Sequence, residues 1–361
     1  MANVGVIAAG SWGTAVASQL ANAGHSVCIW TRNKEDADTI NLFHENKKYL
    51  KAYKLSPNLK ASSVMKEAAF DKDLIILATP SMYLVETVER LLEEGIFADS
   101  SELASNEESG KPIIGILSKG FLQSEEGHPL FITEKLKTMF PYPVNNRLVY
   151  ISGPSHAEEV VQGKLTGLIV ASTNAIASIK AREILRSRSL LVFSSLDVIG
   201  VQTCAAAKNI IAIAFGMLFA FKESSNIFGD NTESLLLAAG LNEMQKLGQS
   251  LGATHSETFT SIAGVGDLDI TCRSKYGRNR RFGMQIVKDN ILDKFSSIDD
   301  ILEHPERIGY ISEGVPACKY VYHLSEERKI KLPISDAVYK VLNKELNPRD
   351  LLIKLLAGEN I

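Results

Sequence analysis

The sequence predicts an α/β protein in which a doubly wound sheet comes first and an all-α C-terminal domain follows. Short apolar runs alternate with helical patterns through the first half of the chain. Long helical stretches without a β pattern fill the second half. Because 361 residues exceed one hydrophobic core of ordinary size, we expect two domains, at 1–195 and 196–361.

The chain begins with a βαβ unit. Its apolar residues predict a strand at 4–7, a helix at 15–23 and a second strand at 26–30. A buried strand, a turn of small residues and a helix in this order are typical of a Rossmann-like dinucleotide-binding domain. Further strands are expected at 74–78, 112–117, 148–152, 166–171 and 190–194.

The first turn, Ala8-Ala9-Gly10-Ser11-Trp12-Gly13, carries the first functional hypothesis. In a dinucleotide site the backbone here approaches the pyrophosphate, and the amides of the following helix face it. The G-x-G-x-x-G fingerprint has a glycine where Ala8 stands, so this turn must accommodate a Cβ. By itself the turn fits either a dinucleotide site or an ordinary βα turn.

The end of the second strand bears on the choice of cofactor. An acidic residue there binds the ribose 2′-hydroxyl of NAD, but this chain has Thr31-Arg32-Asn33. Arg32 could stack on adenine, pair with a 2′-phosphate or be a solvated loop charge, and its place in the βαβ unit favours a cofactor contact. No carboxylate stands there to repel the 2′-phosphate, so we expect NAD or NADP as cofactor.

Charge and cysteine content exclude several classes of protein. The 39 Lys and Arg against 42 Asp and Glu give a net charge of -3, which argues against binding nucleic acid or a membrane surface through bulk charge. The four cysteines are far apart without a C-x-x-C pair, so no zinc site or disulfide framework is expected and a reducing cytoplasm fits.

Two stretches are interpreted as structural. The longest apolar run, 210–221, is shorter than the roughly 20 residues that span a bilayer, so we expect a buried helix and no membrane insertion. Residues 95–111 are polar and acidic and predict an exposed insertion, to which we assign no function.

The helical half carries a lysine in an apolar helix. Helices are expected at 198–222, 232–251, 281–288, 314–326 and 334–342, and Lys208 and Asn209 stand amid small apolar residues of the first. A buried lysine is uncommon unless it is paired or functional, and desolvation brings its pKa toward the range of a general acid. The alternative is a lysine that reaches the helix edge or pairs structurally.

Three loops could hold an anion. In the first, the glycines near Asp267 suggest a tight backbone bend that presents this carboxylate. Arg278-Asn279 then offers a guanidinium and an amide suited to phosphate, although this Arg-rich stretch could be a solvated helix start. The loops at 118–120 and 153–157 follow strand ends, where open α/β sheets bind ligands, but the second is also an ordinary helix start.

Taken together, the motifs resemble those of the NAD(P)-dependent sn-glycerol-3-phosphate dehydrogenases of bacterial type. The matching segments occur in the order of that family, at 9–14, 118–120, 153–160, 207–214, 228–231 and 263–281. The resemblance implies hydride transfer between NAD(P)H and dihydroxyacetone phosphate to give sn-glycerol 3-phosphate, without a metal. It also implies a cytoplasmic homodimer that acts on a phosphorylated triose and supplies glycerophospholipid synthesis.

The resemblance assigns roles by position. It implies Lys208 as the proton donor, with Lys119 and Asp267 as further catalytic residues. The implied cofactor-binding residues are Gly10, Ser11, Trp12, Gly13, Arg32, Lys119, Ala157, Arg278, Ile311 and Glu313. The implied substrate-binding residues are Lys119, Gly153, Ser155, Lys208, Asn209, Asp267, Thr271, Arg278 and Asn279.

The chain also departs from the family pattern. Ala8 replaces the first glycine of the turn, Gly277 stands where many relatives have a serine, and His156 replaces a common phenylalanine. Residues 202–204 differ from the usual acidic and glycine-rich lead into the lysine helix. The rival hypotheses are a hydroxy-acid or hydroxyacyl dehydrogenase, which would use a His-centred pair, and an inactive dinucleotide sensor, which would lack Lys208 or Asp267.

Overall fold

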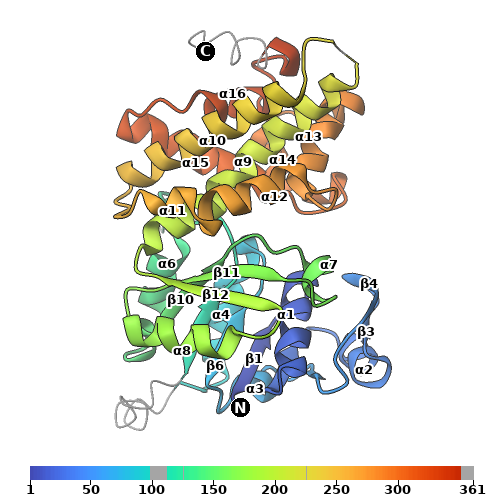
Figure 1. Ribbon diagram of the computed structural model, residues 1–361, viewed down its shortest axis with the longest axis vertical. Coiled ribbons are helices and arrows are strands. Elements are labelled where there is room, and N and C mark those ends of the chain that lie inside the picture. The colour runs from blue at the N-terminus through green and yellow to red at the C-terminus, as the bar shows by residue number, and fades with distance from the viewer. Residues whose placement is uncertain (98–111, 125, 225, 351–361) are drawn as a thin grey trace. The chain divides into compact units, whose positions relative to one another are not determined.

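The computed structural model describes residues 1–97, 112–124, 126–224 and 226–350, so the predicted acidic insertion lies largely outside the described residues. The chain divides into two compact units. One comprises Met1–Ser124 and Leu130–Val198, and the other comprises Glu125–Pro129 and Ile199–Ile361 (Figure 1). Each unit is described by itself below.

The N-terminal unit is built on an eight-stranded sheet in the order β12-β11-β10-β7-β6-β1-β2-β5. From β5 to β10 all neighbouring strands are parallel, and their order is the 3-2-1-4-5-6 order of a Rossmann sheet. The predicted fold class is therefore confirmed. The strands of this sheet are β1 (Asn3–Ile7), β2 (Ser26–Trp30), β5 (Lys60–Ser62), β6 (Leu74–Leu77), β7 (Ile113–Ile116), β10 (Leu148–Ser152), β11 (Thr166–Ala171) and β12 (Leu190–Ser195).

The sheet is not parallel throughout, because β11 runs antiparallel to β10. A parallel neighbour needs a crossover of a dozen or more residues that carries the chain back along the sheet, usually as a long helix. Between β10 and β11 the only helix is α7 (Ala157–Val160), which is too short to return the chain. The longer α8 (Ala175–Leu185) then connects β11 to the parallel β12.

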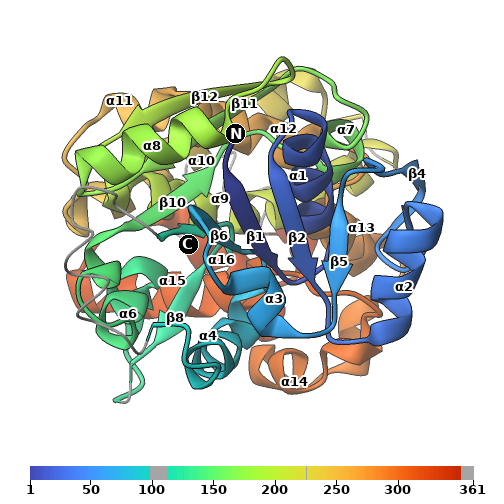
Figure 2. The ribbon, with the colours of Figure 1, turned by 90° about the horizontal axis from the view of Figure 1, so that it is seen from below.

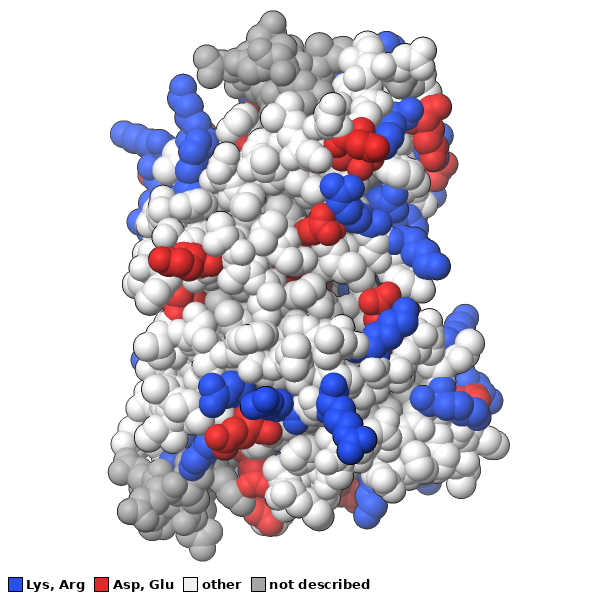
Figure 3. Space-filling view, viewed as in Figure 1, with Lys and Arg blue, Asp and Glu red and all other residues white. Residues whose placement is uncertain are grey.

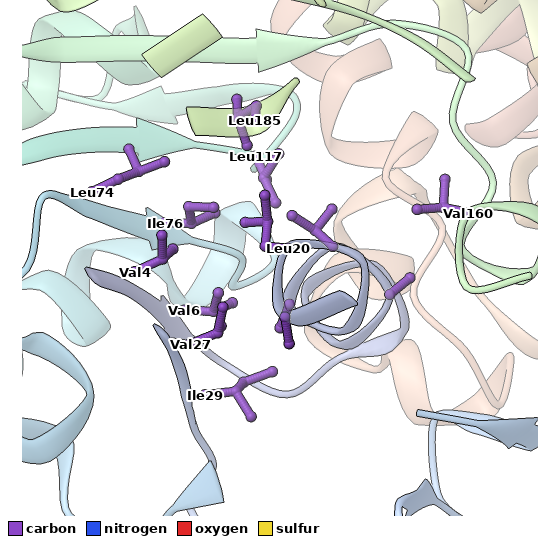
Figure 4. Close-up of a cluster of buried hydrophobic side chains, with 14 of the residues drawn as sticks. Val4, Val6, Leu20, Val27, Ile29, Leu74, Ile76, Leu117, Val160 and Leu185 are labelled. Atoms are coloured by element: carbon purple, nitrogen blue, oxygen red, sulfur yellow. The ribbon is translucent and has the colours of Figure 1, made fainter. Parts of the chain in front are cut away.

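Helices cover both faces of the sheet. Figure 2 shows α1 (Ser11–Asn22) and α8 on one side and α3 (Met65–Ala69), α4 (Leu84–Glu93) and α6 (Ile132–Met139) on the other. This arrangement follows from the strands, because successive side chains of a strand point to opposite faces of the sheet. On one face, Val4 and Val6 of β1 pack with Leu20 of α1 in one buried cluster (Figure 4). The cluster holds the N-terminal end of α1 at the carboxyl edge of β1.

Small β elements of this unit were not predicted. The strands β3 (Glu45–Asn46) and β4 (Leu50–Lys54) form an antiparallel hairpin, and β8 (Phe121–Gln123) pairs with β9 (Pro129–Phe131). The first hairpin follows α2 (Lys34–Phe43) and lies with it at one edge of the unit (Figure 1). Its lysine-rich sequence lacks the sustained alternation of apolar and polar residues from which a strand is predicted.

The C-terminal unit is helical, and the described part of the chain after β12 contains no strand. Its predicted helices are present, with ends that shift by up to three residues. The helices are α9 (Val198–Lys222), α10 (Asp230–Ser250), α11 (Glu257–Thr260), α12 (Asp267–Arg273), α13 (Arg278–Lys288), α14 (Ile298–Glu303), α15 (Gly314–Arg328) and α16 (Pro333–Leu342). A π-helical turn at Ile262–Gly266 leads directly into α12.

The long helix α9 meets α13 at two glycines. A Cβ added to Gly216 would lie 2.1 Å from the carbonyl oxygen of Arg280, and one added to Gly283 would lie 2.0 Å from that of Ile213. The two backbones therefore touch, and this contact brings the first turn of α13 to the middle of α9. By length and composition α9 could cross a membrane, but 89% of its apolar window is buried, as in the core helix of a soluble protein.

Charges are mixed on the surface. On the face drawn in Figure 3, acidic and basic side chains lie interspersed between broad uncharged areas. This agrees with the nearly balanced composition. The four cysteines are free, and the described residues hold no group of three or more His, Cys, Asp or Glu placed to bind a metal.

Candidate active site

A buried ion pair lies in the C-terminal unit. Lys208 of α9 donates hydrogen bonds to the Asp267 carboxylate and, over 2.9 Å, to the Thr271 hydroxyl. The side chains of Lys208 and Asp267 are only 5% and 1% exposed. A buried ammonium is costly unless it is paired and hydrogen-bonded, and both conditions are met here. Three residues that the sequence singled out are therefore brought together.

The local fold explains this convergence. Asp267 and Thr271 are four residues apart on α12, so their side chains share one face of the helix. The Thr271 hydroxyl donates to the Asp267 carbonyl oxygen over 2.5 Å, which leaves its oxygen free to accept from Lys208. The preceding π-helical turn requires a glycine, because a Cβ on Gly264 would lie 1.9 Å from the carbonyl oxygen of Phe259. π-Helical turns often occur at functional sites.

The pair is shielded from solvent. Burial raises the pKa of the neighbouring Cys272 thiol, and the positive charge of Lys208 acts on it in the opposite direction. Cys272 is therefore a neutral packing residue and not a nucleophile. In such surroundings the charge of Lys208 is weakly screened and acts strongly on any group that reaches it.

A second network of buried amides adjoins the pair along α9. The Asn279 amide nitrogen donates to the side-chain oxygen of Asn209 over 2.8 Å. The Asn279 side-chain oxygen accepts from the Ser312 hydroxyl at 2.8 Å and from the Gly314 amide at 2.9 Å. Asn279 thus ties α9, α13 and the start of α15 together. Ser312 was not predicted as part of this site, since an isolated serine before a helix carries no specific signal.

The other residues expected near this network are more open. Arg278, the first residue of α13, is exposed, while Ile311 and Glu313 are half-buried and flank Ser312. Gly277 caps α13, and a Cβ there would lie 2.8 Å from the carbonyl oxygen of Thr271. A serine at this position would require the backbone to shift, which gives the glycine a structural reason.

The turn that was predicted to bind an anion connects β1 to α1 in the N-terminal unit. Helix α1 begins at Ser11, and Gly10 precedes it in extended conformation. A Cβ on Gly10 would meet nothing within 4 Å, whereas one on Gly13 would lie 2.4 Å from the carbonyl oxygen of Ala8. Gly13 is therefore needed for packing inside the turn, and Gly10 faces open space, as a residue that leaves room for a ligand would.

Ala8 takes a backbone conformation that favours glycine. Its φ is 89°, on the side of the Ramachandran plot that favours glycine. Such a conformation costs an alanine on the order of 1–3 kcal/mol, so the surrounding structure has to maintain it. The geometry of the fingerprint is kept although its first residue is not.

The remaining expected residues of this unit lie at the carboxyl edge of the sheet. Arg32 is exposed just after β2, and Ala157 is buried at the start of α7, which packs on α1. Lys119 is half-buried in the loop after β7. The Ser155 hydroxyl, after β10, donates to the Gly153 carbonyl oxygen over 2.9 Å. This edge is where open α/β sheets bind ligands.

The expected sites draw on both units. The N-terminal unit carries Gly10, Ser11, Trp12, Gly13, Arg32, Lys119, Gly153, Ser155 and Ala157. The C-terminal unit carries Lys208, Asn209, Asp267, Thr271, Arg278, Asn279, Ile311 and Glu313. Within each unit the described geometry supports a local site, a backbone turn in the first and a buried ammonium in the second.

Family models cover almost the whole chain. Residues 3–178 match the model described as NAD-dependent glycerol-3-phosphate dehydrogenase N-terminus, and residues 197–353 match the model for the C-terminus of the same enzyme. The chain belongs to this family. The predicted resemblance is therefore confirmed, and the two models divide near the boundary between the two units.

Individual members of the glycerol-3-phosphate dehydrogenase family are similar over their full length. The chain is 56% identical to a glycerol-3-phosphate dehydrogenase (NAD(P)+) of Treponema denticola, covering 99% of this chain and 98% of the relative. It is 51% identical to the Treponema pallidum protein of the same name, with 96% of each covered. A crystal structure of glycerol-3-phosphate dehydrogenase from Coxiella burnetii matches with a TM-score of 0.79 and 28% identity over 98% of both chains.

Proposed function

We propose that this chain interconverts dihydroxyacetone phosphate and sn-glycerol 3-phosphate by hydride transfer with NADH or NADPH. Membership of the glycerol-3-phosphate dehydrogenase family over nearly the full length supports the reaction. The observation that carries the mechanism is the buried Lys208, held by Asp267 and Thr271. The supply of glycerol phosphate for phospholipid synthesis is part of the same proposal.

The N-terminal unit is proposed to bind the dinucleotide. The amides at the start of α1 and the open space over Gly10 suit a pyrophosphate, which the helix dipole also favours. A nicotinamide dinucleotide bound there would supply or accept the hydride. Arg32, exposed after β2, is proposed to reach its adenosine end. Trp12 packs partly against the core and would offer its remaining surface to the cofactor.

Lys208 is proposed to donate the proton to the carbonyl oxygen of the substrate. Negative charge develops on this oxygen as the carbonyl carbon is reduced, and an ammonium both stabilises that charge and supplies the proton. Asp267 and Thr271 fix the direction of the lysine side chain before substrate arrives. In the oxidation of glycerol phosphate, the neutral amine of Lys208 would accept the hydroxyl proton. Lys119 is proposed as a further catalytic residue.

Phosphate recognition is proposed for Arg278 and its neighbours. A guanidinium binds phosphate through paired charge-assisted hydrogen bonds, and Arg278 is exposed at a helix start next to the buried Asn279. Gly153, Ser155, Asn209 and Thr271 are proposed to line the substrate site. Ile311 and Glu313 lie on either side of Ser312, which Asn279 holds in place, and are proposed cofactor contacts.

We further propose that the enzyme is a cytoplasmic homodimer that does not insert into membranes. The high burial of α9 supports the last point. Analytical ultracentrifugation would test the dimer: a single species at the mass of one 39.5 kDa chain would refute it. Fractionation of cells would test the location, and recovery of the enzyme in the membrane fraction after a salt wash would refute it.

The decisive experiment is an assay of NADH and NADPH oxidation at 340 nm with dihydroxyacetone phosphate as substrate. We expect activity with at least one dinucleotide, and formation of sn-glycerol 3-phosphate in equal amount. Matched assays with unphosphorylated dihydroxyacetone and with a 2-keto acid separate the alternatives. Activity on the 2-keto acid alone would indicate a hydroxy-acid dehydrogenase, and binding of dinucleotide without turnover of any substrate would indicate a sensor.

A further inference from the structure

The hairpin β3–β4 is attached to the anion-binding turn through one buried side chain. Asn46, the last residue of β3, is only 6% exposed. Its amide nitrogen donates to the Ala9 carbonyl oxygen and to the Thr14 hydroxyl, both over 2.9 Å. Ala9 lies inside the turn and Thr14 in the first turn of α1, so a single amide bridges the turn and the helix that it enters.

The other side of the amide organises the hairpin itself. The Asn46 side-chain oxygen accepts from the Tyr49 amide over 3.0 Å. The Tyr49 carbonyl oxygen in turn accepts from the Ser11 hydroxyl over 2.6 Å. The strand register between β3 and β4 shifts at Glu45 and Asn46, which is where the side chain leaves the hairpin for the turn. The hairpin and the turn therefore form one hydrogen-bonded assembly.

The hydrogen bonds between the hairpin and the turn can hold Ala8 in its unfavourable backbone conformation. A glycine at this position would adopt the positive φ at little cost, whereas an alanine tends to leave it. The residue after Ala8 is Ala9, whose carbonyl is held by Asn46. A rotation of the backbone at Ala8 that relieves its φ would move Ala9 and break this bond. Asn46 thus opposes the relaxation to which the alanine is prone.

We propose that Asn46 is a positioning residue of the dinucleotide site. It holds the turn Ala8–Gly13 in the conformation that binds the pyrophosphate, and so compensates for the missing first glycine. It does not touch the cofactor. The inference rests on the proposed function, because it assumes that this turn binds a dinucleotide, and it adds a residue and a compensation that the fingerprint itself does not contain.

The test compares Asn46→Ala with Asn41→Ala by titration of each protein with NADH, followed by fluorescence. Asn41 is a matched control, since its amide also joins two backbone groups, donating to the Ala61 carbonyl oxygen and accepting from the Ala61 amide, but it does not contact the turn. We expect the Kd for NADH to rise on the order of 10-fold in Asn46→Ala, because this change corresponds to the loss of one to two net hydrogen bonds. In Asn41→Ala the Kd should stay within about 2-fold of the parent value.

A second readout separates positioning from general damage. At saturating NADH, kcat and the KM for dihydroxyacetone phosphate should remain within about 2-fold of the parent in both variants, because only the binding of dinucleotide is weakened. Melting temperatures should fall in both. An equal change of Kd in the two variants, or no change in Asn46→Ala, would overturn the proposal.

The Ala8→Gly variant provides a direct test of the compensation. Asn46→Ala can also be measured in this variant if it does not fold in the parent protein. Ala8→Gly restores the fingerprint, so Asn46→Ala in that background should raise the Kd about 3-fold or less, a coupling that a double-mutant cycle measures. Strictly additive effects would refute the link to Ala8. Assays of the parent protein separate a failure of the proposed function from a failure of this inference. If the parent binds NADH but does not reduce dihydroxyacetone phosphate, the proposed function fails while the role of Asn46 stands.

Discussion

In the proposed function, the buried Lys208 and the exposed Arg32 and Arg278 would present positive charge to a ligand in two different ways. Lys208 is fixed by a carboxylate and a hydroxyl before any substrate arrives, in surroundings that screen it weakly. The two arginines are solvated, and a ligand would have to order them. A preorganised charge lowers the barrier of a reaction, whereas a solvated one contributes mainly to binding. Substitution of Lys208 should therefore affect mainly kcat, and substitution of either arginine should affect mainly KM.

The largest effect is expected for Lys208→Met. Methionine keeps the apolar stem but removes the proton donor and the charge that meets the developing alkoxide. The kcat for dihydroxyacetone phosphate reduction should fall on the order of 10²- to 10⁴-fold, with little change in the Kd for NADH. Steady-state kinetics and fluorescence titration measure the two quantities.

Lys222→Met is the matched control, because Lys222 lies on the same helix and pairs with Asp230 and Glu233. It should retain turnover. Near-normal kcat in a folded Lys208→Met protein would remove Lys208 from the mechanism. Removing one partner of a buried pair leaves the other charge uncompensated, so a collapse of stability without loss of kcat at low temperature would indicate a structural role.

An intermediate effect is expected for Arg278→Lys, since lysine cannot reproduce the paired hydrogen bonds of a guanidinium. The KM for dihydroxyacetone phosphate should rise on the order of 10-fold, with a smaller change in kcat. Arg281→Lys is the control, because Arg281 is on the same helix but has no part in the proposed phosphate clamp. Its guanidinium carbon lies over the Tyr310 ring, 3.8 Å from the ring centre. Wild-type KM values for both substrate and dinucleotide in Arg278→Lys would contradict the phosphate clamp.

A smaller effect is expected for Arg32→Asp. The carboxylate would lie against a 2′-phosphate, so the ratio of kcat/KM for NADH to that for NADPH should increase several-fold, up to about 10-fold. The parent should use both dinucleotides. Lys34→Asp changes the same charge at an exposed position two residues along and should leave the ratio nearly unchanged. An unchanged ratio in Arg32→Asp would mean that Arg32 is a solvated loop charge.

Glu243 offers a buried charge that has no part in the proposed chemistry. Its carboxylate accepts from the Ile334 amide and, at 3.1 and 2.8 Å, from the amide and hydroxyl of Ser335 at the start of α16. Burial raises the pKa of this carboxyl to about 7 in spite of these bonds. The folded state therefore binds more protons than the unfolded state between the ordinary pKa of 4.5 and pH 7.

The free energy of unfolding should thus decrease through this group as the pH rises from about 4.5 to 7, by at most about 3 kcal/mol. In Glu243→Gln this contribution is absent, so the variant should gain stability relative to the parent over the same range, with unchanged kcat. Urea unfolding at a series of pH values measures the difference. A constant difference would show that Glu243 titrates normally, and the exposed Glu257→Gln is the control.

Most of the architecture could be predicted, because long periodic elements follow local sequence. The bounds 198–222 of α9 and the strands at 26–30, 148–152 and 166–171 were predicted to the residue. The antiparallel direction of β11 was not, since direction depends on how the chain returns after a short helix. The hairpin β3–β4 also lacked a pattern, and its contact with the turn through Asn46 joins residues 37 apart in sequence.

The sequence by itself determined the fold class, the family and the set of candidate residues, because apolar periodicity and motif order are properties of the chain. The family resemblance grouped Lys208 with Asp267, but residue patterns alone could not show that these side chains, 59 residues apart, form an ion pair that Thr271 completes. Nor could they show that Ala8 adopts a positive φ or that Asn279 is held by Asn209 and Ser312. Those features were decided by the tertiary structure, since only packing, such as the glycine contact of α9 with α13, sets which polar groups meet when water is excluded.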